Sequence, residues 1–245
     1  MISKAKVRFI KSLQVKKYRL SEQCFLVQGA KPVRETFDSD YQIVTLCATE
    51  SFLSTCKSAS RAGEVIVVSE PELTSLGSME GNNSALAVVQ MKAPGKPPST
   101  MNSFALILDE IRDPGNLGTI VRIADWFGVK TIVASKGTVD QYNPKVINAS
   151  MGSFLRVNLF YEDLNLFLSS AQIPIYGAFK QGESVHTEKF GKEGLLVIGN
   201  ESNGISPEVE KHVRRRITIP SYGKAESLNA SVATAIILDN IRRQL

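Results

Sequence analysis

The apolar positions of the first 90 residues alternate between helical spacing and short strand-like runs. Residues 3–20 carry apolar side chains every three or four positions, which predicts a helix with one buried face. Strand-length apolar runs follow at residues 24–28, 42–47, 64–68 and 85–90. The segments between these runs fit short helices at residues 32–37, 49–59 and 71–76. This regular alternation predicts a small α/β sandwich.

A second series of apolar runs fills the chain from residue 103 onwards. Its first run, residues 103–109, is almost entirely apolar, as in strands that a parallel sheet buries on both faces. Further strands are predicted at residues 131–134, 157–160, 175–178, 195–198 and 217–219. Helices are predicted at residues 119–127, 143–151, 163–171 and over the C-terminal segment, whereas residues 180–194 are polar and weakly patterned. We therefore expect an α/β sheet with helices on both faces.

Residues 92–100 (KAPGKPPST) separate the two series. They contain three prolines, one glycine and no periodic apolar residue, a composition typical of linkers. We accordingly expect a first domain over residues 1–91, a proline-rich linker over residues 92–101, and a second domain over residues 102–245.

The composition excludes several classes of protein. The chain has 245 residues, of which 43% are hydrophobic and 22% charged, and no apolar run is long enough to span a bilayer. The basic first residues lack the continuous apolar core of a signal peptide. Cys24, Cys47 and Cys56 are scattered, without C-x-x-C spacing, and His186 and His212 are the only histidines. We therefore expect reduced thiols, a cytoplasmic location and no metal site.

Positive charge is concentrated at the start of the chain. The net charge is +5, and only Glu22 and Glu35 oppose the basic residues up to position 35, which are Lys4, Lys6, Arg8, Lys11, Lys16, Lys17, Arg19, Lys31 and Arg34. A cluster of this kind can neutralise the phosphates of a nucleic acid. A solvated helix face would have the same composition, so the charge alone leaves both interpretations open.

The first candidate for chemistry is the segment DPGNLGTIVR at residues 113–122. It follows a buried strand, and a helix starts near Asn116, which places Arg122 nearly two turns into that helix. The expected packing face consists of Leu117, Ile120, Val121 and Ala124. Taken alone, the segment is better explained by a capped helix with a surface arginine.

Two more polar turns follow strands in the last third of the chain. They read IGNESNGI at residues 198–205 and IPSYGKAESLNASVA at residues 219–233. The polar residues in and beside them are too closely grouped for plain loops: Asn200, Glu201, Asn203, Ser227, Asn229 and Ser231. Turns between strand ends and helix starts are where α/β proteins bind ligands. Neither a G-x-G-x-x-G motif nor a phosphate-binding P-loop is present.

The order and spacing of these motifs resemble those of a known family. The set N-L-G-x-x-x-R, G-x-E-x-x-G-I, I-P and S-L-N-x-S-V-A is similar to the signature motifs of the SpoU (TrmH) RNA ribose methyltransferases, of the SPOUT superfamily. The match covers roughly residues 103–245. The first 90 residues, with KSLQVKKYR and FLVQGAKPVRE, resemble the substrate-binding domain of the two-domain, ribosomal-RNA type, which is similar to ribosomal protein L30e.

The resemblance implies a fold and a function. It implies a C-terminal parallel-sheet domain with a deep trefoil knot that binds S-adenosylmethionine, a homodimer, and methylation of a ribose 2′-hydroxyl in RNA without a metal. It assigns the cofactor to Gly199, Ile219 and Leu228, largely through backbone atoms. Ribosomal RNA is favoured over transfer RNA because transfer-RNA members of the family often lack the N-terminal domain.

The resemblance also assigns catalytic positions. Arg122 matches the catalytic arginine, Asn116 and Glu201 match a pair that shapes the site, and the polar residues near the reacting centre are Ser227 and Asn229. Other interpretations are an RNA-binding protein of the same fold without activity, an ordinary nucleotide-binding α/β enzyme, and a transfer-RNA methyltransferase. The second would need a glycine-rich loop after its first strand, a pattern that PGNLG does not fit.

Overall fold

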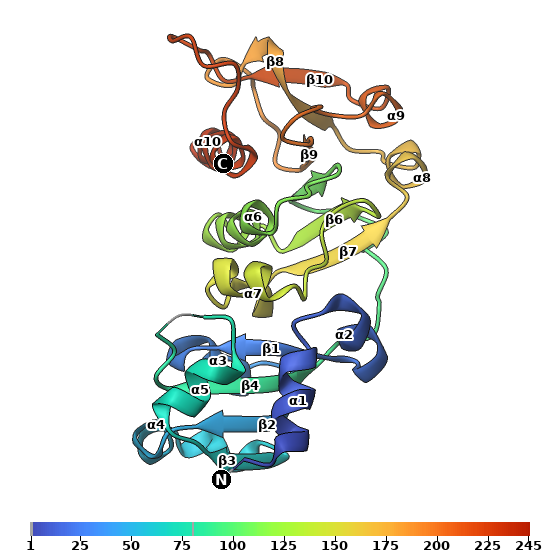
Figure 1. Ribbon diagram of the computed structural model, residues 1–245. Coiled ribbons are helices and arrows are strands. Elements are labelled where there is room, and N and C mark those ends of the chain that lie inside the picture. Colours follow the sequence, from blue (N-terminus) through green and yellow to red (C-terminus); the bar gives the residue numbers. More distant parts are fainter. Residues whose placement is uncertain (1, 80) are drawn as a thin grey trace. The chain divides into compact units, whose positions relative to one another are not determined.

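The computed structural model describes residues 2–79 and 81–245, which form two compact units (Figure 1). The first unit comprises the residues up to Ala93 together with Asp140–Leu155, and the second comprises Pro94–Val139 and Arg156–Leu245. No helix within the described residues is both long and apolar enough to cross a membrane. Each unit has its own sheet.

A four-stranded sheet in the order β1-β4-β2-β3 forms the centre of the first unit. Strand β4 is antiparallel to β1 and β2, and β3 is parallel to β2. The strands are β1 (Cys24–Gln28), β2 (Ile43–Ala48), β3 (Glu64–Val67) and β4 (Ala85–Gln90). The helices are α1 (Lys4–Ser12), α2 (Lys16–Glu22), α3 (Ala30–Phe37), α4 (Glu50–Thr55), α5 (Glu70–Leu76) and α7 (Pro144–Ser150), with 3-10 turns at Lys57–Arg61 and Ser153–Leu155.

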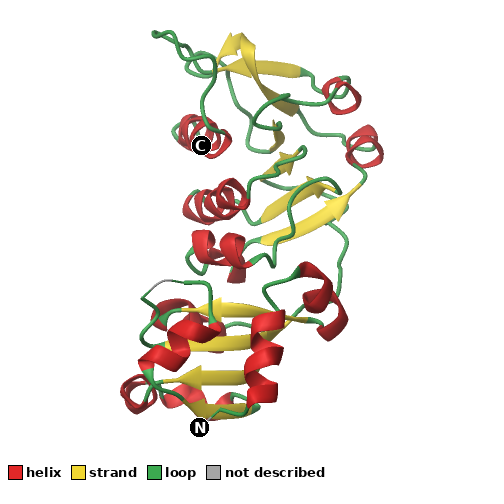
Figure 2. Cartoon of the chain, viewed as in Figure 1, coloured by secondary structure: helices red, strands yellow, loops and turns green. Residues whose placement is uncertain are grey.

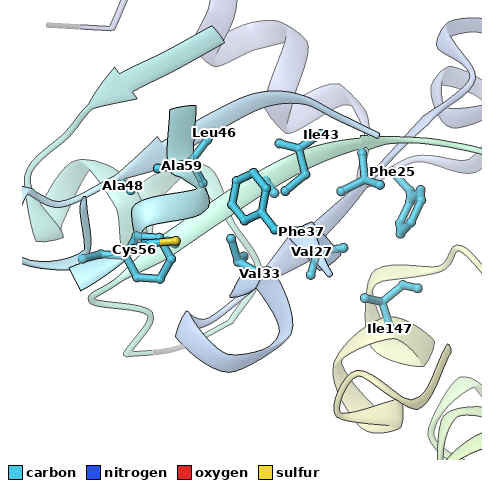
Figure 3. Close-up of a cluster of buried hydrophobic side chains, with 14 of the residues drawn as sticks. Phe25, Val27, Val33, Phe37, Ile43, Leu46, Ala48, Cys56, Ala59 and Ile147 are labelled. Atoms are coloured by element: carbon cyan, nitrogen blue, oxygen red, sulfur yellow. The ribbon is translucent and has the colours of Figure 1, made fainter. Parts of the chain in front are cut away.

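Apolar side chains form a core on each face of this sheet. The face covered by α1 and α5 buries Ile10, Leu13, Leu73 and Leu76. The other face, covered by α3, α4 and α7, is shown in Figure 3 and includes Phe25, Val33, Phe37, Phe52 and Ile147. Strands β1 and β4 are buried along almost their whole length because they lie between these two clusters. The predicted small α/β sandwich is therefore confirmed.

The single helix predicted over residues 3–20 is wrong, because the chain breaks it into α1 and α2. Leu13 ends α1, and Val15 is extended before α2 begins. Arg19 of α2 turns back and donates hydrogen bonds to the carbonyl oxygens of Leu13 (3.0 Å) and Gln14 (2.9 Å). A buried arginine thus satisfies carbonyl groups that the break leaves without helical partners.

The segment Asp140–Leu155 is held in the first unit by polar and aromatic contacts. The Arg19 guanidinium donates to the Asp140 carboxylate over 2.7 Å, and both side chains are almost fully buried. The Tyr142 ring packs on Phe25 with their centroids 4.6 Å apart. Ile147 of α7 joins the apolar cluster around β1 (Figure 3).

The second unit contains a six-stranded sheet in the order β10-β8-β9-β5-β6-β7. Every pair of neighbouring strands in it is parallel. The strands are β5 (Phe104–Leu108), β6 (Thr131–Ser135), β7 (Asn158–Glu162), β8 (Ile175–Ser184), β9 (Gly194–Ile198) and β10 (Arg215–Thr218). The helices are α6 (Pro114–Trp126), α8 (Leu164–Ser169), α9 (Pro207–Glu210) and α10 (Ala230–Arg242). Figure 2 shows α6 and α10 on one side of this sheet and α8 and α9 on the other, which confirms the predicted layering.

Several boundaries in this unit differ from those predicted. Helix α6 begins at Pro114, before the predicted starts at residue 119 and near Asn116, because Asp113 caps it with Pro114 in its first turn. Strand β8 continues to Ser184, within the stretch predicted to be weakly patterned. Its pairing with β10 shifts register between Arg216 and Ile217, where Gly182 lies against the β10 backbone. The turns that follow β5 and β9 are joined by a hydrogen bond from Asn200 to the carbonyl oxygen of Glu110.

Candidate active site

The N-terminus of α6 presents the first group of polar residues. The Asp113 carboxylate accepts a hydrogen bond of 2.8 Å from the backbone N–H of Asn116, which fixes the first turn of the helix. The predicted packing face is confirmed, since the buried residues of α6 include Leu117, Ile120, Val121 and Ala124. Arg122 lies on the exposed part of α6, and its side chain makes no hydrogen bond or ion pair with any described residue. Its guanidinium is therefore available to an external anion.

The turn after β9 is closed by its own backbone. Asn200 and Gly204 exchange two backbone hydrogen bonds of 2.9 Å each. The Asn200 side chain accepts hydrogen bonds from the backbone of Ser202 (2.9 Å) and Asn203 (3.1 Å), and donates one of 2.8 Å to the carbonyl oxygen of Glu110. Asn200 thereby ties the turn both to itself and to the end of β5.

Gly199 occupies a position in this turn that has no room for a side chain. A Cβ atom at Gly199 would overlap the backbone of Gly204 and Ile205, and would lie only 2.5 Å from the Gly204 carbonyl oxygen. The obstacle is backbone rather than a flexible side chain, so it cannot be relieved by a rotamer change. The missing Cβ is thus what allows the two sides of the turn to approach.

The third group follows β10, where residues 221–229 are all exposed. The segment ends at Asn229, the N-cap of α10, whose side-chain oxygen accepts from the backbone N–H of Ser231 (2.9 Å) and from its hydroxyl (2.6 Å). Glu226 pairs with Lys180 of β8 over 2.7 Å, and this hydrogen bond and charge lower the pKa of the Glu226 carboxyl. The segment is therefore anchored by two of its residues, although its surface is open to solvent.

A chain of side-chain hydrogen bonds joins the three groups. Asn116 donates to the Glu201 carboxylate over 2.8 Å and accepts from the Asn229 amide over 2.8 Å. An ionised carboxylate only accepts hydrogen bonds, so Glu201 orients the Asn116 amide nitrogen towards itself. The Asn116 oxygen then faces the Asn229 nitrogen, which leaves the Asn229 oxygen for Ser231. Asn116 is thus joined to residues 85 and 113 positions further along the chain, and each amide side chain has a single orientation.

The structure does not bring all the predicted residues into this hydrogen-bonded chain. Asn116, Glu201 and Asn229 belong to it, whereas Arg122 and Ser227 make no side-chain hydrogen bond with any described residue. The predicted cofactor residues share a different property. In the described part of the chain, no hydrogen bond engages the backbone groups of Gly199, Ile219 and Leu228. Free backbone donors and acceptors at these three positions fit a ligand held by main-chain atoms.

Three further residues support the site, although the sequence assigned them no role. Asn200 and Ser231 were grouped with the polar turns, and the structure shows that they hold Glu110 and Asn229 respectively. Asp109 is buried, and its carboxylate accepts from the backbone N–H of Ser206 over 2.7 Å. An acidic residue directly after an apolar strand was the available signal for Asp109.

Comparisons with known proteins show the family to which the chain belongs. Residues 103–239 match the model of the SpoU rRNA Methylase family, and residues 4–87 match the MRM3-like substrate binding domain. The chain is 28% identical over 242 residues to the 23S rRNA (guanosine(2553)-2'-O)-methyltransferase RlmP of Bacillus subtilis, covering 97% of this chain and 96% of that protein.

Solved structures extend the similarity to the whole chain. A TrmH-family protein of Porphyromonas gingivalis is 36% identical with a TM-score of 0.91, and each chain is covered completely. An AdoMet-bound rRNA methyltransferase of Sinorhizobium meliloti is 26% identical with a TM-score of 0.89, covering 100% of this chain and 97% of the other. The predicted SPOUT-type fold class, with a parallel-sheet domain and a small N-terminal α/β domain, is confirmed.

Proposed function

Because the chain belongs to the SpoU rRNA methylase family, we propose that it is a methyltransferase that modifies a ribose 2′-hydroxyl of ribosomal RNA. The observation that carries this proposal is the hydrogen-bonded chain from Glu201 through Asn116 to Asn229. It joins the three motif segments into one rigid set of side chains at the start of α6. A site fixed in this way can hold a nucleophile and a methyl donor in line.

S-adenosylmethionine is the cofactor that we assign, and it supplies the electrophilic methyl group. The residues that would hold it are Gly199, Ile219 and Leu228, whose backbone groups carry no hydrogen bond in the described chain. Main-chain donors and acceptors can bind the polar edges of the cofactor. Because Gly199 has no Cβ, the two sides of the turn can lie close together there.

Arg122 is assigned to the RNA rather than to the cofactor. A guanidinium stays protonated at neutral pH, so Arg122 cannot act as an ordinary base. Exposed and unpaired, it can instead hold the phosphate next to the target ribose, so that a phosphate oxygen accepts the proton of the 2′-hydroxyl. The positive charge of Arg122 would also stabilise the negative charge that develops on the 2′-oxygen as its proton leaves. Ser227 and Asn229 are assigned to the polar wall around the reacting hydroxyl.

The remaining assignments concern the substrate and the assembly. We assign residues 1–91 to RNA binding, because they carry the basic cluster and match a substrate-binding domain, residues 92–101 to a linker, and residues 102–245 to methyl transfer. A homodimer, a cytoplasmic location and a knotted C-terminal segment complete the proposal. The two-domain organisation, and the 23S rRNA methyltransferase activity of the relative in Bacillus subtilis, favour ribosomal over transfer RNA.

The experiment is methyl transfer from tritiated S-adenosylmethionine to ribosomal or transfer RNA taken from cells that lack the enzyme. We expect label in ribosomal RNA, loss of transfer in Arg122→Ala, and cofactor affinity within about twofold of wild type, since Arg122 is assigned to the RNA. Lys130→Ala, at another exposed basic residue, serves as the control and should retain activity.

Each other outcome changes the proposal in a defined way. Label in transfer RNA alone would overturn the substrate assignment. Cofactor affinity lost in Arg122→Ala, with turnover preserved at saturating cofactor, would contradict the role of Arg122. A wild-type protein that binds RNA but neither binds the cofactor nor transfers label would be a non-catalytic RNA-binding protein.

A further inference from the structure

The segment between β10 and α10, residues 221–229, is the least packed part of the candidate site. All nine of its residues are exposed, and a Cβ at Gly223 would meet no atom within 4 Å. The segment is nevertheless anchored, because Glu226 pairs with Lys180 and Asn229 bonds with Asn116. The loop is therefore held by these two contacts, and its other side chains are accessible to a ligand.

Tyr222 is the most conspicuous of these side chains. It is 95% exposed, so nearly its entire ring is in contact with water, and its hydroxyl makes no hydrogen bond with any described residue. It is also the only aromatic residue in the three motif turns, since residues 109–116 and 199–206 contain none. If this site holds a nucleotide base by stacking on an aromatic ring from these turns, Tyr222 is the ring available.

The charge of the loop is suited to RNA. Lys180 neutralises Glu226, whereas Lys224 is exposed and forms no ion pair with any described residue. The loop therefore has an unpaired positive charge two residues from an exposed aromatic ring. Proteins that bind single-stranded RNA combine these two features, with cations for the backbone and an aromatic platform for the base.

We infer that Tyr222 stacks on a base of the substrate RNA, at or next to the nucleotide whose ribose is methylated, while Lys224 contacts the adjoining phosphate. This inference rests on the proposed function. It assigns Tyr222 to substrate recognition, distinct from the residues that hold the cofactor. Tyr222 belongs to the same exposed segment as Ser227 and Asn229, which are assigned to the reacting ribose.

Three variants test the inference after wild-type enzyme has been used to map the methylated nucleotide. Tyr222→Ala removes the ring, Tyr222→Phe keeps the ring without the hydroxyl, and Leu166→Ala truncates another exposed side chain, on α8, as a control. Loss of one base–aromatic stack corresponds to roughly 5- to 150-fold in binding. We therefore expect Tyr222→Ala to lower kcat/KM for RNA by that range, mainly through KM, and Tyr222→Phe and Leu166→Ala to stay within about threefold.

Abasic RNA identifies the stacked base. In a short RNA spanning the mapped nucleotide, single abasic substitutions are made at the target and at each neighbour. At one of these positions the missing base should lower kcat/KM of the wild-type enzyme about as much as Tyr222→Ala does. The same missing base should lower kcat/KM of the Tyr222→Ala enzyme little further. Such non-additivity is expected only if the ring and that base contact each other.

Several results would overturn the inference. They are a Tyr222→Ala enzyme within twofold of wild type, an equal loss in Tyr222→Phe, and additive losses at every abasic position. Tyr222→Ala that weakens S-adenosylmethionine binding, or that lowers the molecular mass measured by light scattering, would assign the ring to the cofactor or to a second subunit instead. If wild-type enzyme transfers no methyl group to RNA, the proposed function fails and this inference fails with it. Failure of the variants alone leaves the proposed function intact.

Discussion

Replacing Gly199 by alanine is the sharpest test of the turn after β9. The added Cβ would lie 2.5 Å from the Gly204 carbonyl oxygen and would overlap the backbone atoms of Gly204 and Ile205. Non-bonded carbon contacts are favourable only at about 3.5 Å or more, so the two sides of the turn must separate by about 1 Å. No side chain can move to make this room, because every close atom belongs to the backbone.

The magnitude follows from what the separation breaks. The two backbone hydrogen bonds between Asn200 and Gly204 would be stretched or lost, at about 1 kcal/mol each, so the free energy of unfolding should fall by about 2 kcal/mol. The effect on the site should be larger. Glu201, next to Asn200, orients Asn116, and a displacement of about 1 Å in a catalytic set can cost roughly 100-fold in rate. We expect the cofactor dissociation constant to rise at least about tenfold, which is about 1.4 kcal/mol.

Two measurements distinguish an effect of Gly199→Ala on cofactor binding from an effect on the stability of the fold. Isothermal titration with S-adenosylmethionine reports cofactor binding, and urea denaturation reports the free energy of unfolding. Gly223→Ala is the matched control, because a Cβ at Gly223 meets nothing within 4 Å, and it should behave as wild type in both assays. If Gly199→Ala binds the cofactor within twofold of wild type, the assignment of this turn to the cofactor is refuted. If Gly199→Ala binds the cofactor at least about tenfold more weakly but unfolds at the wild-type urea concentration, the predicted loss of stability is wrong while the assignment to the cofactor stands.

Two further predictions concern the first unit. Arg19→Ala should lower the free energy of unfolding by about 3–5 kcal/mol, because it leaves the nearly buried Asp140 carboxylate without its cation; urea denaturation measures this, and a loss under 1 kcal/mol would contradict it. Burial, followed by the charge of Glu64, raises the pKa of the Cys47 thiol to about 11. The thiol has a pKa of about 9 in the unfolded chain, so its contribution to the free energy of unfolding is complete below about pH 9. That contribution is lost as the pH rises from about 9 to about 11. Denaturation of wild type and Cys47→Ala at pH 8 and pH 10.5 should show the smaller pH dependence in the variant, and equal dependence would refute the assignment.

The local sequence pattern predicted most of the strands, because a strand that is buried on both faces requires a continuous run of apolar residues. The residue pattern located β1 and β4 with the same boundaries as the structure, since both strands are buried by helices on two faces. The boundaries that failed depend on distant partners. The break between α1 and α2 is stabilised by Arg19, whose carboxylate partner Asp140 lies 121 residues away. No window of sequence around Arg19 contains that information.

In the candidate site too, local sequence predicted some features, whereas others depend on distant partners. The motifs identified Asn116, Glu201 and Asn229 as polar residues in turns, and the structure shows that they form one hydrogen-bonded chain. What the residue pattern alone could not predict is the direction of that chain, because it depends on which amide faces a carboxylate. It did place Arg122 outside the packing face of α6, and Arg122 is exposed in the structure.

The order of the motifs along the chain has a consequence for how the site forms. Asn116 stands at the start of α6, whereas its two partners come from the last 50 residues, and one of them caps α10. Helices α6 and α10 pack directly against each other, so Asn229 reaches Asn116 only when α10 is docked. The site is therefore complete only after α10 has docked against α6. A ligand that requires all three motif turns binds only the fully docked chain, and by mass action it stabilises that docking.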